Sequence, residues 1–246
     1  MKIRLAYKTI IKSVLLLFFL STRTYAQVFP FGDLTSLGES ADSVNIIILL
    51  TILTLLPSIL IMMTGFTRII MVLSFIRNAI GLHQMPPNQV LIGLSLFLTF
   101  FIMTPVLGEI NETAYKPFIE ESITQEEALK NAEKPIREFM LKQTYGKDLN
   151  LFLELSKTPE PETYDDIKTS IIIPAFITSE LKRAFQMGLF ILIPFIVIDM
   201  VVSSTLLSMG MMMLPPTMIS LPFKILLFVL VDGWGLTIKT LITSFG

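Results

Sequence analysis

Four methionines lie in one short turn of this chain: Met209 is followed directly by Gly210-Met211-Met212-Met213-Leu214-Pro215-Pro216. The turn separates two long hydrophobic stretches. Because thioether side chains are flexible, polarizable and uncharged, a cluster of them suits a surface that must adapt to different shapes. A methionine-rich turn between apolar segments that also carry charges is typical of a pore. The alternative is that these methionines only fill gaps between helices, and composition does not decide between the two.

The composition is that of an integral membrane protein. Hydrophobic residues make up 52% and charged residues 16% of the chain, and the mean hydropathy is +0.71. The net charge of −1 provides no field that would attract nucleic acid. The chain lacks cysteine and has a single histidine, His83, so we expect no disulfide and no metal site. No phosphate-binding loop or nucleophile motif is present, so we expect neither a cofactor nor an enzyme.

The first 26 residues have the layout of a secretory signal peptide. A basic start with Lys2 and Arg4 precedes an apolar stretch over residues 14–20, and small residues end at Ala26. The apolar stretch is too short to cross about 30 Å of hydrocarbon, which disfavours an uncleaved first anchor. We therefore expect the mature chain to begin at Gln27, outside the cytoplasm, with residues 27–43 as an extracytoplasmic segment.

Four hydrophobic segments follow the leader. The first covers residues 44–63 and stays largely apolar to residue 80, and the others cover residues 90–107, 185–207 and 219–242. A single helix over residues 44–80 would be about 55 Å long, more than the bilayer thickness. We therefore expect a break at Pro57 or around Thr64-Gly65, or an end that projects from the membrane.

Residues 108–170 form the only strongly polar part of the chain and predict a small helical domain. Thr124-Gln125-Glu126-Glu127 has the form of a capping box, so a helix should start there. Pro135 should end or kink that helix. Asp148 is placed to cap a second short helix. Because the domain is small, its stability should depend on its neighbours.

These features predict an all-α membrane protein built from two helical hairpins. The first covers residues 44–107 and the second residues 171–246, with the polar domain between them outside the cytoplasm. Pro86-Pro87 opens the second segment as Pro215-Pro216 opens the fourth, so each hairpin has a Pro-Pro turn. From the signal peptide, the loop with Arg68, Arg77 and His83 and the methionine turn are cytoplasmic, in agreement with the positive-inside rule.

Three ionisable residues, Asp199, Lys224 and Asp232, lie inside the third and fourth segments. An ionisable group in hydrocarbon costs several kcal/mol unless it is paired or hydrated. Counted from the turn, Asp199 is about 13 Å deep and Lys224 about 9 Å deep, so the two can form an ion pair. Such a pair either clamps the hairpin or belongs to a proton or ion path, and the scarcity of other polar groups in these helices favours the clamp.

Four stretches of the chain form recognisable motifs. Two of them are long, PAFITSELKRAFQMG (residues 174–188) and PFKILLFVLVDGW (residues 222–234), and two are short, TGFTR (residues 64–68) and QMPPNQ (residues 84–89). The long motifs resemble the two signature stretches of the flagellar biosynthetic FliP family of type III secretion export gates, and the short motifs are also similar to that family. The resemblance covers nearly the whole chain after the leader and is weakest in the acidic domain.

The resemblance implies a helical oligomeric channel at the core of the flagellar export gate. It implies a homo-oligomer of about five copies in the bacterial inner membrane at the flagellar basal body. Small FliQ-like and FliR-like membrane proteins and other export-apparatus proteins would be partners, and unfolded flagellar subunits would pass through. In this family the assembled hairpins are lifted largely out of the bilayer plane.

The family's methionine gasket corresponds to Met211, Met212 and Met213, with Met209 adjacent. The implied mechanism is passive gating, in which methionines close the channel and part when a chain enters. Two other functions are consistent with the residues: a self-contained ion channel or transporter, in which the charged groups line the path, and an assembly scaffold without a pore.

Overall fold

The computed structural model describes residues 50–246 apart from positions 52, 56, 60, 83, 157–162 and 212. The chain divides into two units, Met1–Ile52 and Leu53–Gly246, and the second unit is the one described below. The signal peptide, its cleavage site at Ala26 and Gln27, the segment 27–43, His83 and Met212 lie outside the described residues.

The described part of the second unit is helical and contains no strand. Described residues between 53 and 62 are helical and precede a turn at Met63 to Gly65. The elements that follow are α3 (Phe66–Ile80), α4 (Asn88–Ile110), a π-helical turn η2 (Asn111–Tyr115), α5 (Lys116–Ile119), α6 (Gln125–Gln143), α7 (Gly146–Ser156), a 3-10 turn η3 (Tyr164–Asp166), α8 (Thr169–Ser208), α9 (Pro216–Leu230) and α10 (Gly233–Thr243). The expected break at Thr64-Gly65 is confirmed, whereas described residues on both sides of Pro57 are helical.

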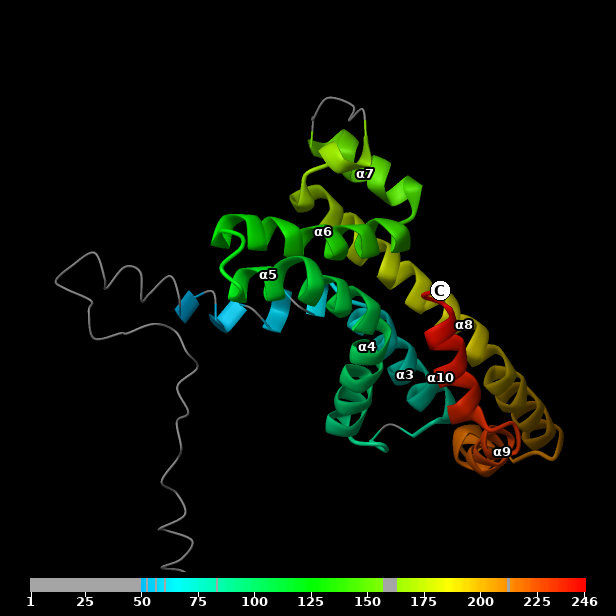
Figure 1. The fold of residues 1–246 in the computed structure, drawn as a ribbon. Helices are drawn as coiled ribbons and strands as arrows, with labels where there is room; N and C mark the ends of the chain where they lie inside the picture. The colour runs from blue at the N-terminus through cyan, green and yellow to red at the C-terminus, as the bar shows by residue number, and fades with distance from the viewer. Residues whose placement is uncertain are drawn as a thin grey trace, which may run out of the picture. The chain divides into compact units, whose positions relative to one another are not determined.

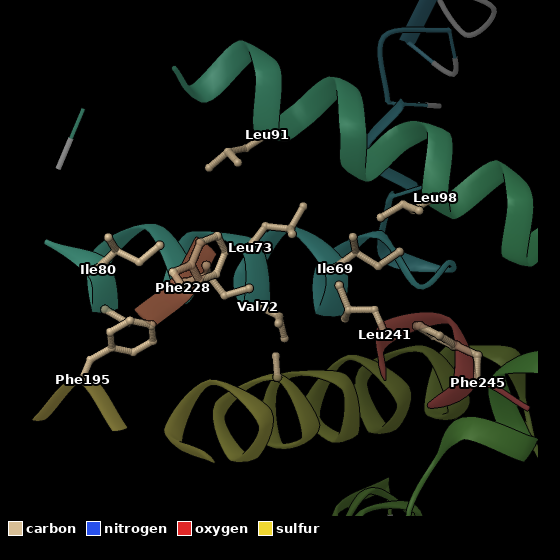
Figure 2. Packing of buried hydrophobic residues seen from close by; sticks show 13 residues of the cluster. Ile69, Val72, Leu73, Ile80, Leu91, Leu98, Phe195, Phe228, Leu241 and Phe245 are labelled. Carbon is tan, nitrogen blue, oxygen red and sulfur yellow. The ribbon is translucent and has the colours of Figure 1, made fainter. Parts of the chain in front are cut away.

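Helix α3 is the centre of the hydrophobic core. Its Ile69, Val72, Leu73 and Ile76 are fully buried, and α8 packs along it more extensively than along any other described helix. Figure 2 shows leucines of α4 on one side of α3, with Phe195 of α8 and Phe228 of α9 near its C-terminal end and Leu241 and Phe245 near its N-terminal end. The wide apolar face of α3 must be covered by neighbouring helices, and α4, α8, α9 and α10 cover it here.

Helix α8 joins the polar helices to the apolar ones. Helices α6 and α7 contact its N-terminal part, and α9 follows it after the methionine turn at the opposite end (Figure 1). A second cluster of buried residues lies where α6 and α7 meet α8, and it includes Met140, Leu149, Ile172 and Phe176. The polar domain therefore shares its core with α8, as its small size predicted.

Helix α6 begins as the sequence predicted and ends later. Thr124 and Glu127 form the capping box, with the Glu127 backbone N–H donating to Thr124 Oγ1 at 3.3 Å and the Thr124 backbone N–H donating to Glu127 Oε2 at 2.9 Å. The hydrogen bonds that the exposed Glu127 carboxylate accepts from the Thr124 backbone N–H and from Thr124 Oγ1 hold its pKa below its usual range. Of the two effects expected at Pro135, an end or a kink, the end does not occur, because α6 continues to Gln143 with the proline buried inside it.

A side chain of α6 contacts the π-helical turn η2. Asn131 Nδ2 donates to the Thr113 carbonyl at 3.1 Å. This hydrogen bond crosses the contact between η2 and α6.

Two described helical stretches are long and apolar enough to cross a membrane, Asn88–Ile119 and Thr169–Ser208. The pair α9 and α10 meets the same test only together and is bent by 61° at its break. The fourth hydrophobic segment, residues 219–242, is therefore divided between two helices with a bend between them. Gly233 is buried close to the Phe228 ring, where an added Cβ would lie 2.2 Å from Phe228 Cε2, and Phe228 also packs edge-on against Trp234.

Candidate functional site

A fully buried ion pair joins α3 to α8. Arg68 Nε donates to Glu180 Oε2 at 2.9 Å, and Arg68 Nη2 donates to Glu180 Oε1, so the guanidinium meets the carboxylate with two parallel hydrogen bonds. Neither side chain is exposed. A bidentate pair of this kind is the arrangement in which a buried arginine and carboxylate satisfy each other best.

The remaining donors of Arg68 hold the C-terminal residues and the end of α6. Arg68 Nη1 donates to the carbonyl oxygen and to Oγ of Ser244, both at 2.9 Å, and Nη2 donates to Gln143 Oε1 at 3.1 Å. Gln143 Nε2 in turn donates to the Phe245 carbonyl at 2.9 Å. The guanidinium also lies over the Phe245 ring, 3.8 Å from its centre. We call these residues, with Glu180, the Arg68 hub.

The Arg68 hub corrects one prediction. Arg68 was expected in a cytoplasmic loop, but it lies inside α3 and is fully buried, so it does not support the positive-inside assignment. Arg77 lies in the last turn of α3, where Nη1 donates to Asn88 Oδ1 at 2.6 Å and holds the start of α4. The sequence signal for the hub was Arg68 in the first apolar stretch and Glu180 just before the third. Charges in such positions predict an ion pair but do not identify its two partners.

Asp148 forms a second buried contact with α8. The expectation that Asp148 caps a short helix is wrong, because α7 already begins at Gly146. Its carboxylate instead accepts hydrogen bonds from Lys182 Nζ and from Ser179 Oγ, the latter at 2.8 Å. Burial by itself raises the pKa of Asp148, but the hydrogen bonds from Lys182 and Ser179 and the Lys182 charge outweigh it and hold the pKa below its usual range.

A third ion pair connects α8 to α9. Lys224 Nζ donates to Asp199 Oδ2 at 2.6 Å, and Ser220 Oγ donates to Asp199 Oδ1, also at 2.6 Å. The contact predicted from the depth of the two residues is therefore present. Both oxygens of the Asp199 carboxylate are occupied from the same face of α9, since Ser220 and Lys224 are four residues apart. Among the described residues, no group of three carboxylate or histidine side chains could hold a metal ion.

Asp232 lies at a break between helices and not inside a helical segment. It has a left-handed backbone (φ 49°), and its side chain accepts a hydrogen bond from the Gly235 backbone N–H at 3.4 Å as the N-cap of α10. The expectation of an ionisable group buried within one helix is therefore wrong for this residue. Aspartate is among the non-glycine residues that tolerate a left-handed backbone best, and it is a favoured N-cap. Local backbone geometry therefore accounts for an aspartate at position 232.

The methionine turn ends α8 with a specific hydrogen-bond pattern. Gly210 has φ 73°, its N–H donates to the Leu207 carbonyl, and the Met211 N–H donates to the Leu206 carbonyl, each at 3.0 Å. This is a Schellman motif, and glycine suits its left-handed position because it has no Cβ. The turn projects its side chains outward: Met209 is 69%, Met211 44% and Met213 98% exposed. Within one chain Met209 and Met213 are therefore mostly uncovered, and Met211 is partly covered.

Sequence comparison places this geometry in a known family. The sequence model of the FliP family matches residues 49–241. The chain belongs to the FliP family. It is 58% identical over 205 residues to the flagellar biosynthetic protein FliP of Bacillus subtilis (strain 168), which covers 83% of this chain and 93% of that protein.

Two further relatives carry the same description. The flagellar biosynthetic protein FliP of Pectobacterium carotovorum subsp. carotovorum is 54% identical over 203 residues, 82% of this chain and 79% of that protein. The flagellar biosynthetic protein FliP of Aquifex aeolicus (strain VF5) is 48% identical over 223 residues, 90% of this chain and 93% of that protein. The region matched by the family model contains Arg68, Gln143 and Glu180 of the Arg68 hub, the Asp199–Lys224 pair and the methionine turn, and it ends before Ser244 and Phe245.

Proposed function

We propose that this chain is the channel-forming subunit of the flagellar type III secretion export gate and passes unfolded flagellar subunits across the bacterial inner membrane at the basal body. Membership of the FliP family and the printed description of its relatives, flagellar biosynthetic protein, support a role in flagellar biosynthesis. The apolar helices support a location in a membrane.

The exposed methionine turn is the observation that carries the channel role. Met213 is almost entirely exposed in a single chain, and Met209, Met211 and Leu214 beside it are exposed as well; a contiguous exposed apolar patch of this kind marks an interaction site. In a ring of subunits, methionines from neighbouring copies would cover one another and form a flexible seal. Flexible thioethers can re-pack around an entering chain, whereas aromatic side chains would pack more rigidly and charged side chains would retain water.

The proposed assembly consists of two hairpins per chain, residues 44–107 and 171–246, with the extracytoplasmic domain 108–170 between them. About five copies would wind into a helical stack together with FliQ-like and FliR-like membrane proteins. Exposed apolar residues along α4, α8 and α9, such as Phe97, Phe190 and Val229, supply faces for subunit or lipid contacts.

A self-contained ion channel fits the charges less well. Such a channel would need free charged groups along its path, but Asp199 and Lys224 neutralise each other, and the Lys224 side chain is only 8% exposed. Their contact fits a clamp that keeps α9 folded back on α8. The driving energy for export would then come from outside this chain.

Substitution of the turn tests the seal. Replacing Met211, Met212 and Met213 with alanine shortens every member of the proposed ring, so cells that carry the variant should leak ions or small solutes while the complex still assembles. The measurement is cell permeability with the amount of complex followed in parallel. The matched control replaces Met62 and Met200 with alanine, because these methionines are comparably exposed but lie outside the turn. Cells that carry the control variant should not leak. An intact barrier with normal complex levels would contradict the gasket.

Processing of the leader is tested separately. N-terminal sequencing of the membrane-extracted protein should begin at Gln27 if cleavage follows Ala26. Recovery of Met1 as the first residue would refute cleavage, without affecting the channel proposal.

A further inference from the structure

Arg183 of helix α8 is left without an anion in the described part of the chain. Glu180 uses both carboxylate oxygens on Arg68, and Asp148 is engaged by Lys182. Arg183 forms none of the ion pairs found among the described residues. Its Nε is buried without a hydrogen-bond partner, whereas its two terminal nitrogens, which are also without one, are not among the buried atoms.

The side chains around Arg183 hold its guanidinium in place. The guanidinium lies over the Tyr145 ring, 4.4 Å from the ring centre, and the Tyr145 hydroxyl donates to Gln186 Oε1 at 3.4 Å. Lys147, two residues after Tyr145, is a second exposed cation. We call Arg183, Tyr145, Lys147 and Gln186 the basic face. The terminal nitrogens of Arg183 remain available there for an anion of another molecule.

A cavity on another side of the chain carries the opposite charge. It has a volume of about 500 Å³ and lies between α4, α6 and the residues at the end of α10. Its lining includes Phe101, Glu109, Glu138, Phe139 and Lys142, which we call the acidic groove. Both glutamates are exposed, and neither forms any of the ion pairs found among the described residues. Lys142 offsets one of the two carboxylate charges, so these side chains keep a net negative charge.

The basic face and the acidic groove lie at the same height of the chain, on either side of the Arg68 hub. Gln143 lines the groove and accepts a hydrogen bond from Arg68, and Arg183 follows Glu180 by three residues, about 4.5 Å along α8. Helices α4 and α8 lie on opposite sides of α3 (Figure 2). Two complementary surfaces that face different ways at one height are suited to a head-to-tail contact between identical subunits.

We propose that Arg183 of one copy binds the carboxylates of Glu138 and Glu109 in the acidic groove of the next copy. The free terminal nitrogens of the guanidinium suit a carboxylate with two parallel hydrogen bonds. Phe101, which is exposed in a single chain, becomes covered in this contact and helps to exclude water from it. The proposal rests on the homo-oligomer of the proposed function and specifies which surfaces of neighbouring copies meet.

Cross-linking tests whether these surfaces are neighbours. The chain has no cysteine, so Lys142→Cys in the groove and Gln186→Cys in the basic face introduce a unique pair and leave Arg183 and Glu138 in place. Membranes that contain the full complex are treated with a short bismaleimide, and the chain is followed by immunoblotting. The double variant should give a ladder of dimers and larger products, because each copy links to two neighbours. Each single variant should remain monomeric.

The control for the cross-link combines Lys142→Cys with Glu154→Cys. Glu154 is exposed on α7 and belongs to neither surface, so this pair should give no ladder.

Charge reversal tests the ion pair itself. In the double-cysteine variant, Glu138→Arg places like charges opposite each other and should lower both the ladder and the homo-oligomer, measured by native mass spectrometry, by about tenfold or more. Adding Arg183→Glu should restore part of both. Glu154→Arg is the matched control, because it makes the same charge change outside the two surfaces and should alter neither readout. If Arg183→Glu does not fold, Arg183→Gln takes its place, since it also removes the repulsion.

The outcomes separate this contact from the channel role. A ladder that Glu138→Arg leaves unchanged, or a loss that neither Arg183 variant reverses, would overturn the ion pair. A dimer from Gln186→Cys alone would mean that like surfaces meet and would overturn the head-to-tail arrangement. A homo-oligomer without the cross-link would overturn the contact and leave the channel role standing. Absence of any homo-oligomer would overturn the proposed function as well.

Discussion

The two ends of helix α8 carry ion pairs of opposite design. At the N-terminal end, Glu180 and Arg68 are fully buried, and Gln143 and Ser244 satisfy the rest of the guanidinium, so α3, α6, α8 and the residues after α10 meet at one point. Near the C-terminal end, Asp199 and Lys224 join only α8 and α9, and the Asp199 side chain is 32% exposed.

This difference separates the part of the molecule that defines the fold from the part that is free to contact others. A polar group buried without water must be satisfied completely, so the Arg68 hub permits one arrangement of its elements. In the methionine turn beyond Asp199, by contrast, the side chains of Met209, Met211 and Met213 are exposed. The following three predictions test this comparison.

Breaking the Arg68 hub should have the largest effect. Arg68→Met leaves the Glu180 carboxylate buried and uncompensated, which should cost about 3–5 kcal/mol of the free energy of unfolding. Denaturant unfolding of the purified chain in detergent measures the loss. The double variant Arg68→Met with Glu180→Leu removes both charges and should recover part of it. Unchanged stability of Arg68→Met would show that the hub does not hold the fold.

Breaking the pair between α8 and α9 should have a smaller effect. Lys224→Met leaves Asp199 alone, but partial exposure lets water hydrate the carboxylate, so we expect a loss at the lower end of the same range, about 3 kcal/mol. The measurement is the yield of assembled complex in a double-mutant cycle with Asp199→Leu, where removal of both charges should restore part of the yield. Strictly additive losses would mean that the two residues do not interact.

The smallest effect should come from Asp148, which lies next to the hub but pairs with a half-exposed lysine. Asp148→Asn should cost about 1.5–3 kcal/mol at neutral pH, the range for hydrogen bonds to a charged group. Because its folded pKa is depressed, the contribution of Asp148 is complete above its unfolded value of about 3.9 and is lost as the pH falls through the folded pKa.

Stability curves of the wild-type chain and Asp148→Asn, recorded between about pH 6 and pH 3, should therefore converge at the acid end. Glu154→Gln is the control, since Glu154 is an exposed carboxylate on the same helix, and at neutral pH it should change stability by less than about 0.5 kcal/mol. A constant difference between wild type and Asp148→Asn over the whole range would contradict the depressed pKa.

Local patterns in the sequence predicted the features whose partners lie nearby in the chain. The Thr124 capping box involves residues three apart, and both of its hydrogen bonds form. The break at Thr64-Gly65 follows from the length of an apolar stretch that a single helix could not place in a bilayer. The Asp199–Lys224 contact could be predicted because a short turn connects the two segments, so counting residues from that turn gives the depth of each residue.

Tertiary structure decided the positions whose partners are distant in the chain. Arg68 and Glu180 are 112 residues apart, and Asp148 and Lys182 are 34 residues apart. No periodicity indicates which carboxylate a given cation will meet, because that depends on how helices cross. Asp232 shows the same limit on a smaller scale: its sequence position suggested a helix interior, and the packing of Phe228 against Gly233 and Trp234 accompanies a break there instead.

The sequence by itself determined that the chain is an apolar helical membrane protein of the FliP type, because hydropathy, helix signals and long motifs are properties of consecutive residues. Only the tertiary structure decided that α3 is the buried centre, that Arg68 joins four elements, and that Met209, Met211 and Met213 are exposed. These features depend on which surfaces of distant helices meet, and burial of a polar group is favourable only where every partner is in place.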